Sequence, residues 1–287
     1  MIIDMRFRPP YKGFLNLHVY ARPAEFVHSG LKGVPPAPSR VQKSVDLMFK
    51  EMDEAGITIG CLLGRRAIPP FSNVPNEDVL EFARTYPDRF IAMPCIEPTD
   101  RVKAMEELEF LLAQPEVKAI HLEPAWAAIP KKADDPNLYP IYDRCDRAGM
   151  PVVISAGGTI GPDFNWVNPI YVQHVANDFP KLKIALAHGG WPWVQQALAV
   201  AYACPNLYLS ADMYLNVPNM PGQLEYVRAA NFFLGDRLLF GTAYPARPML
   251  HSVKSFNELP FDEGVREKVL GLNAIAFFGL KLPPVVG

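Results

Sequence analysis

The amino-acid sequence predicts an α/β fold, a single (β/α)8 TIM barrel formed by residues 1–287. The chain has 287 residues, 49% hydrophobic and 20% charged, which is enough for one large core. Eight short runs rich in β-branched and other apolar residues alternate with stretches of helical periodicity. This alternation is typical of βα units around a parallel sheet, and eight units favour a closed barrel. A doubly wound open sheet is the alternative fold.

The predicted strands are nearly continuous apolar runs, as expected of strands buried on both faces. They cover residues 2–8, 57–63, 90–95, 117–123, 151–156, 182–188, 206–210 and 237–241. Each is followed by a predicted helix, and in the first helix we expect Ser39 as the N-cap and Gly56 as the left-handed stop. The helices cover residues 39–55, 76–86, 100–114, 138–148, 168–179, 192–203, 222–233 and 262–278.

Residues 9–38 form a long loop after the first predicted strand. It is far longer than an ordinary connection and carries Tyr11, His18, Tyr20 and His28. Two interpretations remain open. The loop either closes over the barrel mouth as a lid or covers it as a rigid proline-rich wrap.

Composition excludes several classes of function. The formal net charge of −2, without a run of Lys or Arg, predicts no nucleic-acid partner. Charged residues within the first ten positions and the lack of an 18-residue apolar stretch predict neither secretion nor a membrane partner. The widely spaced cysteines are expected to be reduced thiols of a cytoplasmic protein, and homo-oligomerisation is left open. These cysteines are Cys61, Cys95, Cys145 and Cys204.

Polar residues stand where the predicted strands end. In a TIM barrel the chemistry lies at these carboxyl ends and in the loops that follow them. Residues of equal parity on one strand point the same way, so we expect Asp4, Arg6 and Arg8 to face the barrel axis together. The other candidates are His121, Glu123, Ser155, His188, Ser210, Asp212 and Tyr244.

The same strand ends carry a family resemblance. The segments are Asp-Met-Arg-Phe-Arg-Pro at 4–9, Ile-His-Leu-Glu-Pro at 120–124, Ala-His-Gly-Gly-Trp-Pro at 187–192 and Phe-Gly-Thr-Ala-Tyr-Pro at 240–245. In this order they resemble the amidohydrolase-2 family, which includes aminocarboxymuconate semialdehyde decarboxylase-like enzymes and pyrone dicarboxylate lactonases. The resemblance covers nearly the whole chain and implies a barrel enzyme.

The resemblance also implies a metal site that this sequence has largely lost. The family's His-x-His pair is Arg6 and Arg8 here, its fifth-strand histidine is Ser155, and its eighth-strand aspartate is Ala243. Only His188 matches. Catalytic zinc normally needs three protein ligands, and guanidinium groups repel a divalent ion, so we expect neither metal nor any other cofactor. A rebuilt site is the alternative, with ligands from His121, Glu123, His188 and Asp212.

Two arginines at the barrel mouth predict an anion site. Guanidinium groups keep their charge and can bind a carboxylate or phosphate with two hydrogen bonds each. The alternative is an internal salt-bridge network in which Asp4 and Glu123 neutralise Arg6 and Arg8.

His188 is the best candidate for a general acid or base, with Glu123 or His121 in support. Its Gly-Gly-Trp-Pro context predicts a turn into a helix with Pro192 in the first turn. Ser155 lacks a Gly-x-Ser-x-Gly context, so we expect it to be a polar substrate contact together with Asp212 and Tyr244.

These features predict a hydrolase that acts without a metal on a small carboxylated, lactone-like substrate. The pyrone dicarboxylate lactonases are the metal-free precedent that the resemblance implies. Two alternatives remain, namely a non-catalytic ligand-binding barrel and a decarboxylase of the same family.

Overall fold

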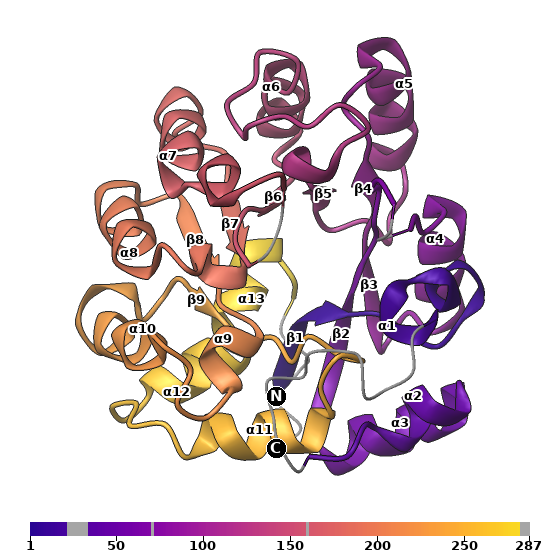
Figure 1. The fold of residues 1–287 in the computed structure, drawn as a ribbon, viewed down its shortest axis with the longest axis vertical. Coiled ribbons are helices and arrows are strands. Elements are labelled where there is room, and N and C mark those ends of the chain that lie inside the picture. The colour runs from indigo at the N-terminus through magenta and orange to yellow at the C-terminus, as the bar shows by residue number, and fades with distance from the viewer. Residues whose placement is uncertain (22–33, 70–71, 159–160, 282–287) are drawn as a thin grey trace.

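Parallel strands and outer helices alternate along the chain in this computed structural model, which describes residues 1–21, 34–69, 72–158 and 161–281. Figure 1 shows the strands as an inner ring with helices around it. The strands are β1 (Ile2–Phe7), β2 (Ile57–Leu63), β3 (Phe90–Met93), β4 (Cys95–Ile96), β5 (Ile120–Leu122), β6 (Val152–Ser155), β7 (Ile184–Ala187), β8 (Leu207–Ser210) and β9 (Leu238–Leu239).

The strands pair in sequence order and close into a barrel. Pairing runs β1-β2-β3 and β4 to β9, all parallel. Pro94, which has no N–H to donate, separates β3 from β4. Ala92 of β3 links the two sheets, because its carbonyl accepts from the Lys118 N–H at 3.0 Å and its N–H donates to the Glu116 carbonyl at 3.0 Å. On the other side the Met5 N–H donates to the Phe240 carbonyl at 3.0 Å. The predicted closed barrel is confirmed, and the open sheet is excluded.

At least one helical segment follows each strand except β3, which only Pro94 separates from β4. The outer helices shown in Figure 1 are α3 (Val45–Glu54), α4 (Asn76–Thr85), α5 (Arg101–Leu112), α6 (Tyr139–Ala148), α7 (Pro169–Asp178), α8 (Val194–Ala203), α10 (Gln223–Ala229), α11 (Met249–Asn257) and α12 (Val265–Glu267). The other helical segments are η1 (Lys12–Asn16), α1 (His18–Ala21), α2 (Pro38–Gln42), η3 (Pro124–Trp126), η4 (Phe164–Val167), η5 (His188–Gly190), α9 (Met213–Asn216), η6 (Ala230–Leu234), η7 (Lys268–Leu272) and α13 (Asn273–Phe278).

Two predicted helix starts are wrong. The helix expected over 39–55 breaks at Lys43, which has a left-handed φ of 51°, and Ser44 rather than Ser39 caps the second half by accepting from the Leu47 N–H at 3.2 Å. Gly56 does adopt the expected positive φ of 70°. The helix expected from 192 begins only at Val194, so Pro192 is not in its first turn. Helix α11 was not predicted.

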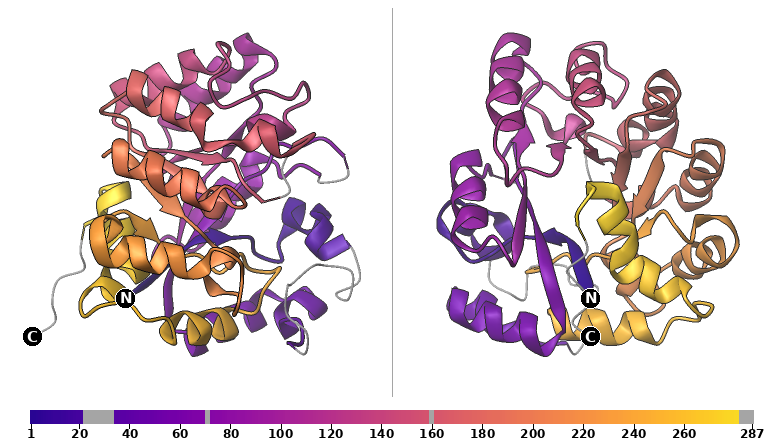
Figure 2. Two further views of the ribbon diagram at one scale, coloured as in Figure 1. Left: turned by 60° about the vertical axis from the view of Figure 1, so that its left-hand side comes forward. Right: turned by 180° about the vertical axis from the view of Figure 1, so that it is seen from behind.

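Apolar side chains fill the barrel interior at its amino-terminal end. The inner cluster takes one face of the strands, and Phe277 and Phe278 of α13 close it from below. Figure 2 shows α13 across the end of the barrel where the N-terminus lies. Besides Ala119, which directly precedes β5, the cluster includes the strand residues Ile3, Met5, Cys61, Leu63, Ile91, Met93, Val153, Ala185, Ala187 and Leu239. Polar strand residues therefore gather at the opposite, carboxyl end.

The described part of the long loop after β1 packs on the barrel. Phe14 and Leu17 are fully buried, and the Tyr20 hydroxyl donates to the Arg8 carbonyl at 2.7 Å. Figure 2 shows α1 at the end of the barrel away from the N-terminus. These contacts favour a fixed wrap for residues 10–21. His28 and the other residues of 22–33 lie outside the described residues, so the lid stays a prediction.

Within the described ranges, no helix combines the length and the apolar character needed to cross a bilayer.

Candidate active site

A β-bulge in β1 positions the two arginines. Asp4 pairs with Gly60 and Phe7 with Leu62, so three steps along β1 match two along β2. Met5 packs in the inner cluster, whereas Phe7 packs outside the barrel against Phe90, with ring centroids 5.3 Å apart. Side chains therefore do not alternate strictly between the two faces of β1 from Met5 to Phe7. The expectation that Asp4, Arg6 and Arg8 face the barrel axis together rested on such alternation. The extra residue re-aims the side chains that follow it.

Arg6 and Arg8 are buried at the carboxyl end of the barrel with part of their hydrogen-bonding capacity unused. Arg6 Nε lies 3.7 Å from Asp212 Oδ2, and Arg8 Nε donates to the Leu63 carbonyl at 3.2 Å. Arg6 Nη1 and Arg8 Nη2 have no hydrogen-bond partner in the part of the chain that the structure describes. Unpaired buried donors of this kind are costly unless an anion binds them.

Arg65, which the sequence reading missed, neutralises Glu123. Its guanidinium donates to both carboxylate oxygens, with Nη2 at 3.0 Å from Oε1 and Nε at 3.1 Å from Oε2, and it lies 4.6 Å from the Trp126 ring centroid. Burial raises the pKa of Glu123, but Arg65, His121 and Arg8 together hold it at about 2. An ionised carboxylate held this way cannot donate a proton and is a weak base.

His121 is occupied at both ring nitrogens. Nδ1 lies 2.9 Å from the Gly64 carbonyl, which can only accept, so Nδ1 carries the proton and Nε2 accepts from the Ser155 hydroxyl at 2.8 Å. Burial, more than the nearby Arg8 and Arg6, lowers the pKa of His121 to about 3. The imidazole is neutral, and its contacts fix Ser155 rather than prepare it for proton transfer.

His188 differs from His121 in its hydrogen bonding. It is buried directly after β7, and neither Nδ1 nor Nε2 has a hydrogen-bond partner among the described residues. Its backbone N–H donates to Asp212 Oδ2 at 3.3 Å, and Nδ1 lies 3.6 Å from the same oxygen. Burial, followed by the charge of Arg6, lowers the pKa of His188 well below its usual value. The ring is therefore neutral and able to accept a proton.

Asp212 connects the imidazole with the arginines. It accepts from the Ser210 hydroxyl at 2.7 Å and lies beside Arg6 and His188. Burial raises its pKa, while Arg6 acts against this rise. Its backbone has φ 50° and ψ −129°, a conformation that a residue with a Cβ rarely adopts. Such strained positions cluster at functional sites.

Asp4 is buried next to the site and binds the backbone of two residues there. It accepts from the backbone N–H groups of Thr242 at 2.8 Å and Arg6 at 3.0 Å, and from the Thr242 hydroxyl. Burial nevertheless raises the pKa of Asp4 from 3.8 to about 7. A carboxyl whose pKa is higher in the folded than in the unfolded chain lowers stability once it ionises.

We expect Asp4→Asn to stabilise the protein relative to wild type at pH 8 but not at pH 4. Between about pH 4 and 7 the unfolded chain has lost the Asp4 proton and the folded chain has not, so wild-type stability falls with rising pH. Thermal unfolding at several pH values measures this difference, with the exposed Asp88→Asn as the control. A difference that does not change between pH 4 and 8 would contradict the assignment.

Tyr244 lies apart from these residues. Its hydroxyl is 2.7 Å from the Ser39 hydroxyl, and its ring packs on Phe7 with centroids 4.8 Å apart. The structure brings the other candidates together but gives Tyr244 a role in the packing behind β1.

The donor atoms present do not fit a divalent metal. Cys95, His121 and Glu123 offer ligand atoms within 4.8 Å of one another. However, both His121 nitrogens are already bonded, and Arg65 holds the Glu123 carboxylate. A cation there would also meet Arg8, which lies close enough to affect the pKa of both groups.

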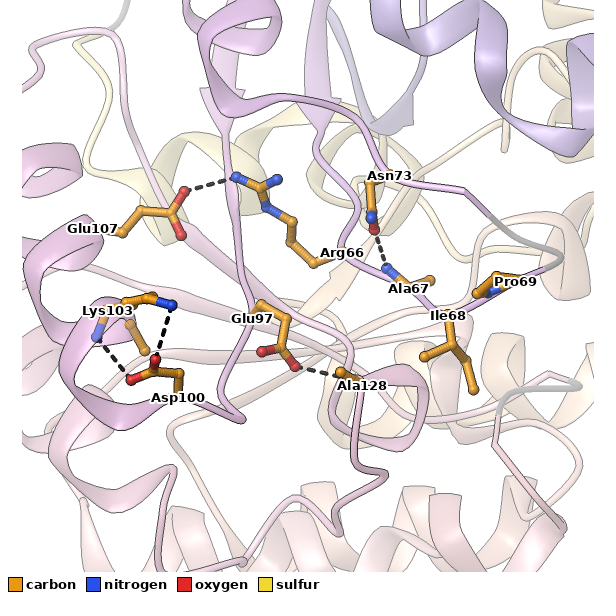
Figure 3. A pocket seen from close by; sticks show the side chains of 11 residues that line it. Arg66, Ala67, Ile68, Pro69, Asn73, Glu97, Asp100, Lys103, Glu107 and Ala128 are labelled. Carbon is orange, nitrogen blue, oxygen red and sulfur yellow. Dashed lines mark hydrogen bonds and ion pairs between the residues drawn. The ribbon is translucent and has the colours of Figure 1, made fainter.

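A hollow of about 450 Å³ lies beside the barrel mouth, between the loop after β2 and α5. Figure 3 shows its charged side chains paired with each other, as in Arg66 with Glu107 at 2.8 Å and Lys103 with Asp100 at 3.2 Å. None of the candidate residues lines it. We therefore place the candidate active site at the arginine and His188 cluster rather than in this hollow.

Fold and site together define a (β/α)8 barrel with buried arginines, carboxylates and an imidazole at the carboxyl ends of its strands. The profile of the amidohydrolase family matches residues 34–280, and the chain belongs to this family. An uncharacterised TIM-barrel protein from Bordetella bronchiseptica is 42% identical, with a TM-score of 0.92 over 97% of this chain and 98% of that one.

Two decarboxylases are more distant relatives. The 2-amino-3-carboxymuconate-6-semialdehyde decarboxylase of Dictyostelium discoideum is 22% identical over 71% of this chain and only 65% of its own length. The 5-carboxyvanillate decarboxylase of Sphingomonas paucimobilis is 17% identical, with a TM-score of 0.65 over 98% and 99% of the two chains. At this identity the second similarity supports the fold alone.

Proposed function

We propose that the protein is a hydrolase that cleaves an ester or lactone bond of a small carboxylated substrate without a metal. The observation that carries this proposal is a group of buried nitrogens without hydrogen-bond partners among the described residues, namely Arg6 Nη1, Arg8 Nη2 and both ring nitrogens of the neutral His188. The two arginines supply charge for a carboxylate, and the imidazole supplies a base.

In the proposed reaction Arg6 and Arg8 bind the substrate carboxylate and face the charge that develops on the attacked carbonyl. His188 takes a proton from water as the water attacks, and Asp212 stabilises the resulting imidazolium. Binding of an anion offsets the positive field of the arginines. The pKa of His188 therefore rises when substrate binds, and the imidazole becomes a stronger base.

Glu123 and His121, which the sequence suggested as supporting catalysts, act indirectly in this proposal. Glu123 holds Arg65, and His121 holds Ser155. Ser155 and Asp212 remain proposed contacts to the bound substrate or to its attacking water.

The name of the Dictyostelium relative supports a small carboxylated substrate and favours decarboxylation as the second candidate reaction. A barrel that binds carboxylates without turnover is the remaining alternative. Release of CO2 distinguishes the second candidate, and binding without any product distinguishes the third.

The test is a screen of carboxylated lactones, carboxylated esters and aromatic carboxylates with chelator-treated protein. We expect hydrolysis of at least one ester or lactone in chelator, and far less than one metal equivalent per chain by elemental analysis. One tightly held metal per chain, with activity lost on its removal, would overturn the proposal.

A further inference from the structure

Tyr214 stands at the proposed active site, although the sequence reading did not include it. It lies in α9, two residues after Asp212, and the residue is only 9% exposed. Its ring stacks on Trp191, with centroids 4.8 Å apart and planes 13° apart, and meets the His188 ring edge-on at 5.8 Å. These two aromatic contacts hold the Tyr214 ring in place and do not involve its hydroxyl.

Gly158 locates the Tyr214 hydroxyl relative to His188. A Cβ at Gly158 would lie 2.7 Å from Tyr214 Oη and 3.8 Å from His188 Cγ. The hydroxyl and the imidazole therefore both lie next to this glycine. A side chain at 158 would collide with the hydroxyl, so the glycine allows Tyr214 to hold its hydroxyl beside His188.

The Tyr214 hydroxyl has no hydrogen-bond acceptor among the residues that the structure describes, unlike the Tyr226 hydroxyl, which donates to the Gly189 carbonyl at 3.0 Å. Burial raises the pKa of Tyr214 to about 12, with Arg6 acting against the rise. The phenol is therefore protonated throughout the physiological range and holds a proton with no fixed acceptor.

We infer that Tyr214 is the general acid that protonates the leaving oxygen in the proposed hydrolysis. Water adds to the carbonyl carbon as His188 takes one of its protons. The carbon–oxygen bond to the leaving group then breaks, and Tyr214 gives its proton to that oxygen. The imidazolium of His188 returns its proton to the tyrosinate, so ester and water become acid and alcohol.

This inference rests on the proposed function and makes a distinct prediction about leaving groups. An alkoxide needs a proton to leave, whereas a nitrophenolate does not. We expect Tyr214→Phe to lower kcat by about 10²-fold or more for an alkyl ester of a small dicarboxylic acid. With the nitrophenyl ester of the same acid we expect a loss of about threefold or less.

Tyr208→Phe is the matched control, because it removes a hydroxyl from β8 at the apolar end, where the ring packs on Phe277. We expect it to leave both rates unchanged. An equal loss for both esters in Tyr214→Phe would indicate a structural role and overturn the inference, as would no loss for either ester.

A binding measurement separates this inference from the proposed function. A carboxylated phosphonate monoester mimics the tetrahedral intermediate, and the phosphinate with CH2 in place of the leaving oxygen lacks the acceptor. We expect Tyr214→Phe to lower the affinity for the phosphonate ester by about 10-fold and to leave the affinity for the phosphinate unchanged. If wild type neither binds the two analogues nor hydrolyses an ester, both ideas fail. If wild type binds the analogues and hydrolyses an ester, and Tyr214→Phe lowers the affinity for the two analogues equally, only the assignment of Tyr214 fails.

Discussion

Replacement of His188 by Asn is expected to lower kcat by about 10²- to 10⁴-fold on whichever ester or lactone the wild type hydrolyses. Asn keeps a polar group of similar size near Asp212 but cannot accept a proton from water. Because the substrate carboxylate is held by the arginines, KM should change far less than kcat. Steady-state kinetics of both proteins measures the two effects separately.

The pH profile of wild type gives a second check on the same residue. Burial and the neighbouring arginines lower the pKa of His188 in the free protein. The acid limb of kcat/KM reports the free enzyme and should therefore lie well below pH 6.5. The acid limb of kcat reports the enzyme with bound substrate and should lie at higher pH, because the bound anion offsets the charge of the arginines. His174→Asn, on the surface of α7, is the control and should leave kcat and both limbs unchanged. A wild-type acid limb retained in His188→Asn would refute the assignment.

Replacement of Arg8 or Arg6 by Met is expected to weaken carboxylate binding by about 30- to 1,000-fold, because each arginine offers a desolvated donor to the anion. The ligand-free variants should be as stable as wild type or more stable, since Met removes a buried cation with an unsatisfied nitrogen. Thermal shift with and without the best carboxylated ligand of the screen measures both quantities.

Arg101→Met, at the exposed start of α5, is the control for loss of one positive charge. It should leave the ligand-induced shift unchanged. If both mouth variants keep the wild-type shift with every carboxylated ligand, the anion site lies elsewhere. If the ligand-free variants instead unfold at markedly lower temperature, the arginines serve the internal salt-bridge network.

The fold could be predicted because the burial of each strand requires a recognisable run of apolar residues in the sequence. Strands buried on both faces must be continuously apolar, and their boundaries emerged to within a few residues for most strands. The break at Pro94 and the division of the first helix at Lys43 were not anticipated. Neither changes which side chains are buried, so the hydrophobic pattern carries no sign of them.

The site was less predictable because it depends on register and on loops. The bulge between Asp4 and Phe7 follows from the pairing of β1 with β2, which no local pattern records. Tyr244 was included because it follows the eighth predicted strand, but in the structure it packs on Phe7 and contacts the Ser39 hydroxyl. Arg65 follows β2 by two residues, and its position after a predicted strand end was the available signal.

The protonation states could not be deduced from sequence either. His121 and His188 are both histidines at strand ends, but one has two hydrogen-bond partners and the other has none among the described residues. That difference is set by Gly64 and Ser155, which come from two other strand ends. Chemistry at a barrel mouth depends on these contacts between strands.

The backbone at Ala243 has a conformation that is unusual for alanine. Ala243 has a φ of 62°, in the left-handed region that alanine disfavours and that aspartate and asparagine tolerate better. This is the position at which the family resemblance implies an aspartate. The main chain at this position would therefore accommodate an aspartate with less strain than the alanine that is present. As far as the backbone is concerned, an acidic side chain can be introduced at 243 without rebuilding the end of the barrel.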